Sequence, residues 1–127
     1  MPLVRISLMK GKPAHFGKEV GEIVYQAMLT TINIPANDHF QVITEHDHNS
    51  LIYDPNYLDI ERTDGFIVIQ ITLNEGRTLE QKKALYKEIA QRLHAALGVR
   101  TEDVFISLVE VKKENWSFGN GIAQYSQ

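Results

Sequence analysis

The chain repeats itself at a spacing of 65 residues, and this internal duplication limits the folds that it can adopt. Residues 4–45 align with residues 69–110 without a gap at this spacing. Identical pairs occur along the whole alignment: Ile6 and Ile71, Leu8 and Leu73, Gly11 and Gly76, Lys18 and Lys83, Gln26 and Gln91, Asp38 and Asp103, Phe40 and Phe105, Glu45 and Glu110. We therefore treat each copy as one structural unit and predict the fold from the unit and its repeat.

Each unit has the pattern strand, helix, strand. Residues 3–8 alternate between apolar and polar side chains, whereas residues 66–73 are almost continuously apolar, which is typical of a central strand. In the second unit a helix is predicted to begin after Thr78, because Gln81 completes a capping box, and to end at Gly98. One stripe of this helix is apolar and is predicted to be buried: Leu85, Ile89, Leu93 and Leu97.

The helix of the first unit has weaker boundary signals. We expect it to begin near Pro13, a residue favoured in a first helical turn, and to end at Asn33, which aligns with Gly98. The predicted buried residues of this helix are Phe16, Val20, Ile23, Ala27 and Ile32. The units are expected to close with strands over residues 39–45 and 104–111.

These elements predict an α/β fold, in which two duplicated β-α-β units form a four-stranded, mostly parallel sheet with both helices on one face. Residues 1–127 are expected to form a single domain. Alternation places six apolar side chains on the opposite face: Phe40, Val42, Phe66, Val68, Phe105 and Val109. Because such sheets rarely leave an apolar face in water, we expect this face to be buried against other subunits.

Composition excludes several classes of function. The net charge is −3, which argues against a nucleic-acid partner, and the absence of cysteine excludes disulfides and thiolate chemistry. No apolar run approaches the ~18 residues that span a membrane, and no signal peptide is evident, so a cytoplasmic location is expected. His46 and His48 would share one strand face, but further metal ligands are not evident and no metal site is predicted.

Pro2 allows two interpretations. Proline is tolerated at the first residue of a strand, where no hydrogen-bond donor is needed. Alternatively, removal of Met1 would leave Pro2 with a free secondary amine, which in a pocket can carry a proton or act as a nucleophile.

Four sequence features together resemble the tautomerase superfamily. These are the proline-led duplication, IPANDHFQ at residues 34–41, EGRTLEQKK at residues 75–83 and WSFGNG at residues 116–121. Three motifs are most similar to the malonate semialdehyde decarboxylase branch: IPANDHFQ, EQKKALYK at residues 80–87 and WSFGNG. EGRTLEQKK resembles the corresponding segment of 4-oxalocrotonate tautomerase. The likeness covers essentially the whole chain.

The resemblance implies the tautomerase fold, a homotrimer and a catalytic N-terminal proline, here Pro2. It implies that Arg77 binds a substrate carboxylate and that Asp38 assists catalysis. Trp116 and Phe118 would line a small apolar pocket. Each residue also has a structural interpretation: Arg77 as an exposed first-turn residue, Asp38 as a turn former like its mate Asp103, and Trp116 as a core or interface residue.

One position departs from the decarboxylase branch. That branch has two arginines one residue apart, whereas this chain has Glu75 and Arg77. We therefore predict a cofactor-free keto–enol tautomerase acting on a small 2-oxo acid, such as an arylpyruvate, with Pro2 as general base and acid. The alternatives are decarboxylation of a 3-oxo acid or hydration of an unsaturated acid by a cationic Pro2, or a non-catalytic trimer that binds a ligand.

Overall fold

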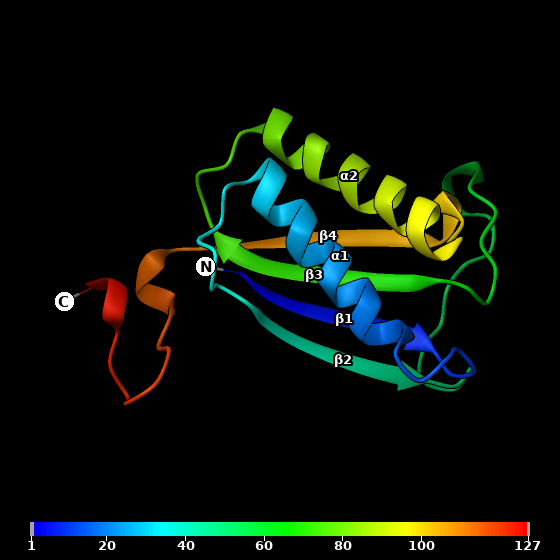
Figure 1. Ribbon diagram of the computed structural model, residues 1–127, viewed down its shortest axis with the longest axis horizontal. Coiled ribbons are helices and arrows are strands. Elements are labelled where there is room, and N and C mark those ends of the chain that lie inside the picture. Colours follow the sequence, from blue (N-terminus) through cyan, green and yellow to red (C-terminus); the bar gives the residue numbers. More distant parts are fainter. Residues whose placement is uncertain (1, 127) are drawn as a thin grey trace.

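Four strands form one sheet in the order β2-β1-β3-β4 in the computed structural model, which describes residues 2–126 (Figure 1). The strands are β1 (Leu3–Met9), β2 (Phe40–His46), β3 (Ile67–Asn74) and β4 (Val104–Val111). Pairing is parallel between β1 and β2 and between β3 and β4, whereas β1 and β3 are antiparallel. This arrangement confirms the predicted duplicated β-α-β units and the mostly parallel sheet.

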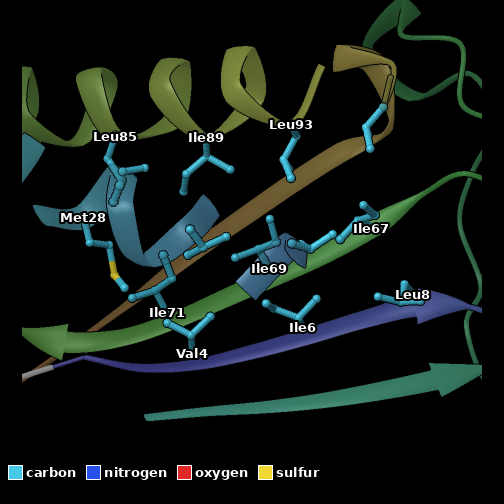
Figure 2. Close-up of a cluster of buried hydrophobic side chains, with 14 of the residues drawn as sticks. Val4, Ile6, Leu8, Met28, Ile67, Ile69, Ile71, Leu85, Ile89 and Leu93 are labelled. Carbon is cyan, nitrogen blue, oxygen red and sulfur yellow. The ribbon is translucent and has the colours of Figure 1, made fainter. Parts of the chain in front are cut away.

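Two helices, α1 (Phe16–Thr31) and α2 (Leu79–Leu97), cover one face of the sheet, as predicted (Figure 1). Between the helices and the sheet lies a continuous apolar core, in which β1 and β3 contribute alternate side chains and α2 contributes its predicted stripe (Figure 2). The labelled core residues in Figure 2 are Val4, Ile6, Leu8, Met28, Ile67, Ile69, Ile71, Leu85, Ile89 and Leu93. Each large aliphatic side chain stabilises the fold by about 1.5–3 kcal/mol when fully buried.

The ends of the helices follow the sequence signals in three of four cases. Thr78 and Gln81 form the predicted capping box at the start of α2, and Gly98 ends that helix with a φ of 68°. Asn33 has a φ of 54°, so it takes the left-handed conformation that Gly98 takes in the second unit. Helix α1 begins at Phe16 and not near Pro13, because the Phe16 amide closes a separate turn on the Pro13 carbonyl.

The sheet face away from the helices is apolar and largely uncovered. Phe40 is 52% exposed and Phe105 is 46% exposed, and Val42 and Val109 are also exposed. The prediction that other subunits bury this face was wrong for Phe66, because residues of the same chain bury it. A second apolar cluster covers it, formed with Met9 and with Leu51 from the connection between the units.

The segments outside the duplication have defined structures. The connection contains a short 3-10 turn, Tyr57–Asp59, and Arg62 donates hydrogen bonds to three carbonyl groups of the same segment, those of Asp54, Tyr57 and Ile60. After β4 the chain forms the 3-10 turns Lys113–Asn115 and Gln124–Ser126. This C-terminal tail, residues 112–126, projects beyond the end of the sheet at which the chain begins (Figure 1). Within residues 2–126, the helices are too short or too polar to cross a membrane.

Candidate active site

The start of the chain is enclosed by two neighbouring strands. Pro2 is buried, and the next residue, Leu3, pairs with Phe40 on β2 and with Thr72 on β3. Because β1 and β3 are antiparallel, the beginning of β1 lies beside the end of β3. The turn before β2 and the turn after β3 therefore meet near Pro2, and these turns carry Asp38 and Arg77.

Asp38 is held in the turn before β2. Its amide donates to the Pro35 carbonyl at 3.1 Å, and the Tyr25 hydroxyl on α1 donates to the Ala36 carbonyl at 2.6 Å. The Tyr25 ring also stacks on His39, with ring centroids 4.2 Å apart, so α1 fixes the turn on both sides of Asp38.

The Asp38 side chain is only 5% exposed. Burial raises the pKa of the Asp38 carboxyl, because removal from water disfavours the charged form. The positive charges of the chain's amino terminus and of Arg77 act in the opposite direction and lower this pKa. The Asp38 carboxyl therefore lies close enough to the amino terminus and to Arg77 to be influenced by both positive charges.

Arg77 is half-buried in the turn between β3 and α2. Its Nη1 donates to the Asn74 carbonyl at 3.2 Å, and its Nη2 lies 3.5 Å from the Ile32 carbonyl at the end of α1. The neighbouring Gly76 has a φ of 121°, a conformation that favours glycine, and it allows the chain to turn sharply before the α2 capping box. Since arginine has five N–H donors, these two bonds orient the guanidinium and leave donors for an anion.

Trp116 and Phe118 reach this region from the tail. The Trp116 indole Nε1 donates to the Asn74 side-chain Oδ1 at 2.7 Å. Phe118 stacks on Trp116, with centroids 5.6 Å apart and an interplanar angle of 18°. Phe118 also contacts Tyr125, so its described ring contacts lie within the tail.

The structure therefore brings Asp38 and Arg77 together at the end of the sheet where Pro2 lies, with Trp116 joined to the same end. Asn74 connects Trp116 to Arg77, and sequence reasoning missed it. The sequence offers no signal that singles out Asn74, because β3 also contains the polar residues Gln70 and Thr72. Glu75, the position that departs from the decarboxylase pattern, is exposed, and its amide donates to the Val111 carbonyl.

The histidine pair shows no arrangement for binding a metal. Strand β2 ends at His46, so His48 lies in the following turn and not on a shared strand face. His46 is hydrogen-bonded with Thr44 and Ser50, and His48 lies 3.5 Å from Asp64. Within residues 2–126, no group of three or more His, Asp or Glu side chains is placed to hold a metal ion.

Comparison with known proteins identifies the family. Residues 38–119 match the family described as tautomerase enzyme, a range that contains Asp38, Arg77, Trp116 and Phe118. The chain is 49% identical over 124 residues to the "Probable tautomerase YusQ" of Bacillus subtilis (strain 168), and the alignment covers 98% of both chains. The chain therefore belongs to the tautomerase family, whose members are isomerase-type enzymes.

Solved structures confirm the fold. A malonate semialdehyde decarboxylase, FG41, inhibited by 3-bromopropiolate, superimposes with a TM-score of 0.89 at 34% identity, covering 97% of this chain and 93% of the other. A fused 4-OT described as a symmetric trimer superimposes with a TM-score of 0.78 at 22% identity and covers 97% of both chains. The chain thus has the tautomerase fold, and its structural neighbours include both a decarboxylase and an oligomer.

Proposed function

We propose that this protein is a cofactor-free tautomerase that interconverts the keto and enol forms of a small 2-oxo acid, such as an arylpyruvate. The observation that carries the proposal is that buried Pro2, buried Asp38 and half-buried Arg77 lie at the same end of the sheet. The positive charges of the amino terminus and of Arg77 both lower the pKa of Asp38 against the effect of burial. After removal of Met1, this end of the sheet would carry a prolyl amine, a carboxyl and a guanidinium, which are the groups that such a reaction needs.

The reaction requires the amine of Pro2 to be free after removal of Met1. In its neutral form the amine accepts the proton from C3 of the keto acid, and the electron pair of that C–H bond becomes the C2=C3 double bond. The electron pair of the C2=O double bond moves to the oxygen, which takes the proton from the prolyl ammonium and becomes the enol hydroxyl, so the neutral amine is regenerated. In the reverse direction the prolyl ammonium returns a proton to C3, so no other reactant is consumed.

Arg77 binds the substrate carboxylate in this proposal. A guanidinium presents two parallel N–H groups that match the two oxygens of a carboxylate. The Asn74 and Ile32 carbonyls orient this group before substrate binds, which reduces the entropy lost on binding. Asp38 assists by hydrogen bonding or by adjusting the pKa of the amine, and Trp116 and Phe118 form the apolar wall.

We further propose that the working form is a homotrimer located in the cytoplasm. The exposed apolar sheet face, which includes Phe40, Val42, Phe105 and Val109, supports burial against other subunits. The trimeric description of the fused 4-OT neighbour supports the same assembly.

Decarboxylation of a 3-oxo acid is the second candidate, with hydration of an unsaturated acid as its variant. The likeness to a malonate semialdehyde decarboxylase favours it. In that case Pro2 would remain cationic and would polarise a carbonyl or protonate a carbanion. Glu75 argues against it, because an acidic residue stands where that branch has a second arginine. A trimer that only binds a ligand would not need the free amine at all.

The decisive experiment follows ketonisation of phenylpyruvate enol by three preparations: the processed protein, Pro2→Ala and a form that retains Met1. Loss of a positioned general base lowers the rate by about 10²–10⁴-fold, so we expect the processed protein to exceed the other two clearly. Equal rates for all three preparations would remove Pro2 from the mechanism. Intact-mass measurement of the processed protein establishes that Met1 is absent.

A further inference from the structure

Asn74 is a buried polar residue that makes two different contacts at the end of β3. It is 8% exposed. Its side-chain Oδ1 accepts a hydrogen bond from the Trp116 indole at 2.7 Å, and its backbone carbonyl accepts one from Arg77 Nη1 at 3.2 Å. One residue therefore joins the tail to the turn that carries the guanidinium.

The side chains of the tail contact one another. Trp116 stacks on Phe118, and Phe118 contacts the Tyr125 ring edge-on at 5.0 Å. The Phe118 amide donates to Gln124, whose side-chain amide donates in turn to the Gly119 carbonyl. Among the hydrogen bonds of residues 2–126, the bond between Trp116 and Asn74 is the only one between a tail side chain and the rest of the chain.

We propose that Asn74 is a positioning residue that fixes the aromatic tail relative to the carboxylate-binding Arg77. The inference rests on the proposed function, in which Arg77 holds the substrate carboxylate and the tail forms the wall of the pocket. With Asn74 in place, the distance between the wall and the guanidinium is set before substrate arrives. Without the side-chain acceptor, the tail detaches and substrate must order it on binding.

An amide suits both contacts at this position. A carboxylate would also accept the indole N–H, but its negative charge beside Arg77 would compete with the substrate. An aliphatic side chain would leave the indole donor without its acceptor. Asn74→Leu therefore removes the bond at similar side-chain size, and Asn74→Asp keeps the acceptor.

The first test needs no substrate, because Trp116 is the only tryptophan in the chain. We expect Asn74→Leu to shift the fluorescence emission to longer wavelength and to increase quenching by acrylamide, because the indole enters water. Asn74→Asp should keep the emission of the parent protein. Met9→Leu, at the equivalent position of the first unit, is the matched control and should leave emission unchanged. Unchanged emission and quenching in Asn74→Leu would overturn the proposal.

The second test is a double-mutant cycle with Trp116→Phe, which keeps an aromatic ring but removes the donor. Loss of this hydrogen bond should raise KM about fivefold in each single variant while kcat changes little. The double variant should show no further rise, because both changes remove the same bond. Additive effects on KM would contradict the proposal. Should Asn74→Leu not fold, an unchanged KM in Trp116→Phe would likewise contradict it.

The two tests separate this proposal from the proposed function. If phenylpyruvate enol is not a substrate of the parent protein, the tautomerase proposal fails, and the fluorescence comparison still decides whether Asn74 anchors the tail.

Discussion

At one end of the sheet Pro2 leads into β1, whereas at the opposite end the equivalent residue of the second unit, Ile67, follows the connecting segment. Both ends have the same elements, because β1 and β3 run antiparallel. At the first end the turn after β3 supplies Arg77. At the second end the turn after β1 supplies Lys12, which lines a shallow pocket with Asp64 and Gly65.

Asp38 and Asp103, which are equivalent in the two units, differ in their contacts. Asp103 accepts hydrogen bonds from the amide and the hydroxyl of Thr63, at 2.7 and 2.6 Å, and lies 3.5 Å from Arg100. It therefore ties down the chain as it approaches β3. Asp38 occupies the equivalent position in the first unit, before β2 and near Pro2, and the charges of the amino terminus and of Arg77 lower its pKa against the effect of burial.

The duplication thus provides two similar ends. At the first end, removal of Met1 would free the amine of Pro2, whereas at the second end Ile67 lies within the chain. Asp103 holds the chain in place before β3, and we propose that Asp38 takes part in the chemistry.

The largest expected effect, on catalytic activity, distinguishes Arg77 from its counterpart in the first unit, Lys12. Replacing Arg77 with alanine should lower kcat/KM for phenylpyruvate enol by about 100-fold, since charge-assisted bonds to a carboxylate are lost. Lys12→Ala should stay within about twofold of the parent, because surface charges away from a site contribute little. Steady-state ketonisation kinetics measure both. Equal losses would show that the two ends are functionally equivalent.

We expect equivalent residues of the two units on the apolar sheet face to contribute alike to self-association. Phe40→Ser and Phe105→Ser should each weaken self-association by about 30-fold, corresponding to roughly 2 kcal/mol of apolar burial. Tyr86→Ser, on the exposed side of α2, is the control and should leave assembly unchanged. Sedimentation velocity over a concentration series measures the effect. Two phenylalanine variants that associate like the parent protein would contradict burial of this face.

The aspartates should respond in opposite directions. Asp103→Asn should lower the free energy of unfolding by about 1–2 kcal/mol, because the carboxylate acceptors for Thr63 are reduced to one. Asp38→Asn should not lower it, and at neutral pH should raise it, because burial penalises the ionised Asp38 carboxyl. Its ketonisation activity should nevertheless fall.

The difference in free energy of unfolding between Asp38→Asn and the parent protein should depend on pH. Because the pKa of Asp38 is raised in the folded protein, the penalty exists above that folded pKa and disappears as pH falls through it. The advantage of Asp38→Asn should therefore shrink on acidification. Urea unfolding of both variants from neutral to acidic pH measures this, and an advantage that grows on acidification would reverse the assigned sign.

The smallest effect concerns the two helix ends. Gly98→Ala should destabilise the fold by about 1 kcal/mol, because a left-handed residue acquires a Cβ. Asn33→Gly should change stability by only a few tenths of a kcal/mol, since glycine is favoured in the same conformation. Chemical denaturation distinguishes them. Equal changes in stability for the two variants would show that the left-handed conformation does not determine the effect of these substitutions.

Much of the fold was predictable because its signals are local and periodic. The alternation in β3, the capping box at Thr78 and the left-handed end at Gly98 each follow from the spacing of neighbouring residues. The covering of Phe66 by Leu51 was not predictable, because it depends on the path of the connecting segment. The start of α1 was misplaced because a turn at Pro13 precedes the helix.

The candidate site was only partly predictable. Asp38 and Arg77 stood out through the family likeness, and their proximity follows from the antiparallel pairing of β1 and β3. The link through Asn74 was not visible, because a hydrogen bond between a strand end and a residue 42 positions later leaves no pattern in the sequence. The bonds that orient Arg77 on the Asn74 and Ile32 carbonyls are likewise tertiary contacts.

The central claim is that the amine of Pro2, freed of Met1, is the working base. Nitrogen NMR of protein labelled in proline can titrate this amine directly, alongside the pH dependence of phenylpyruvate enol ketonisation. We expect a pKa of the amine near neutrality that coincides with the midpoint of the rate profile. A prolyl amine that stays protonated well above neutral pH, while ketonisation proceeds unchanged, would contradict it.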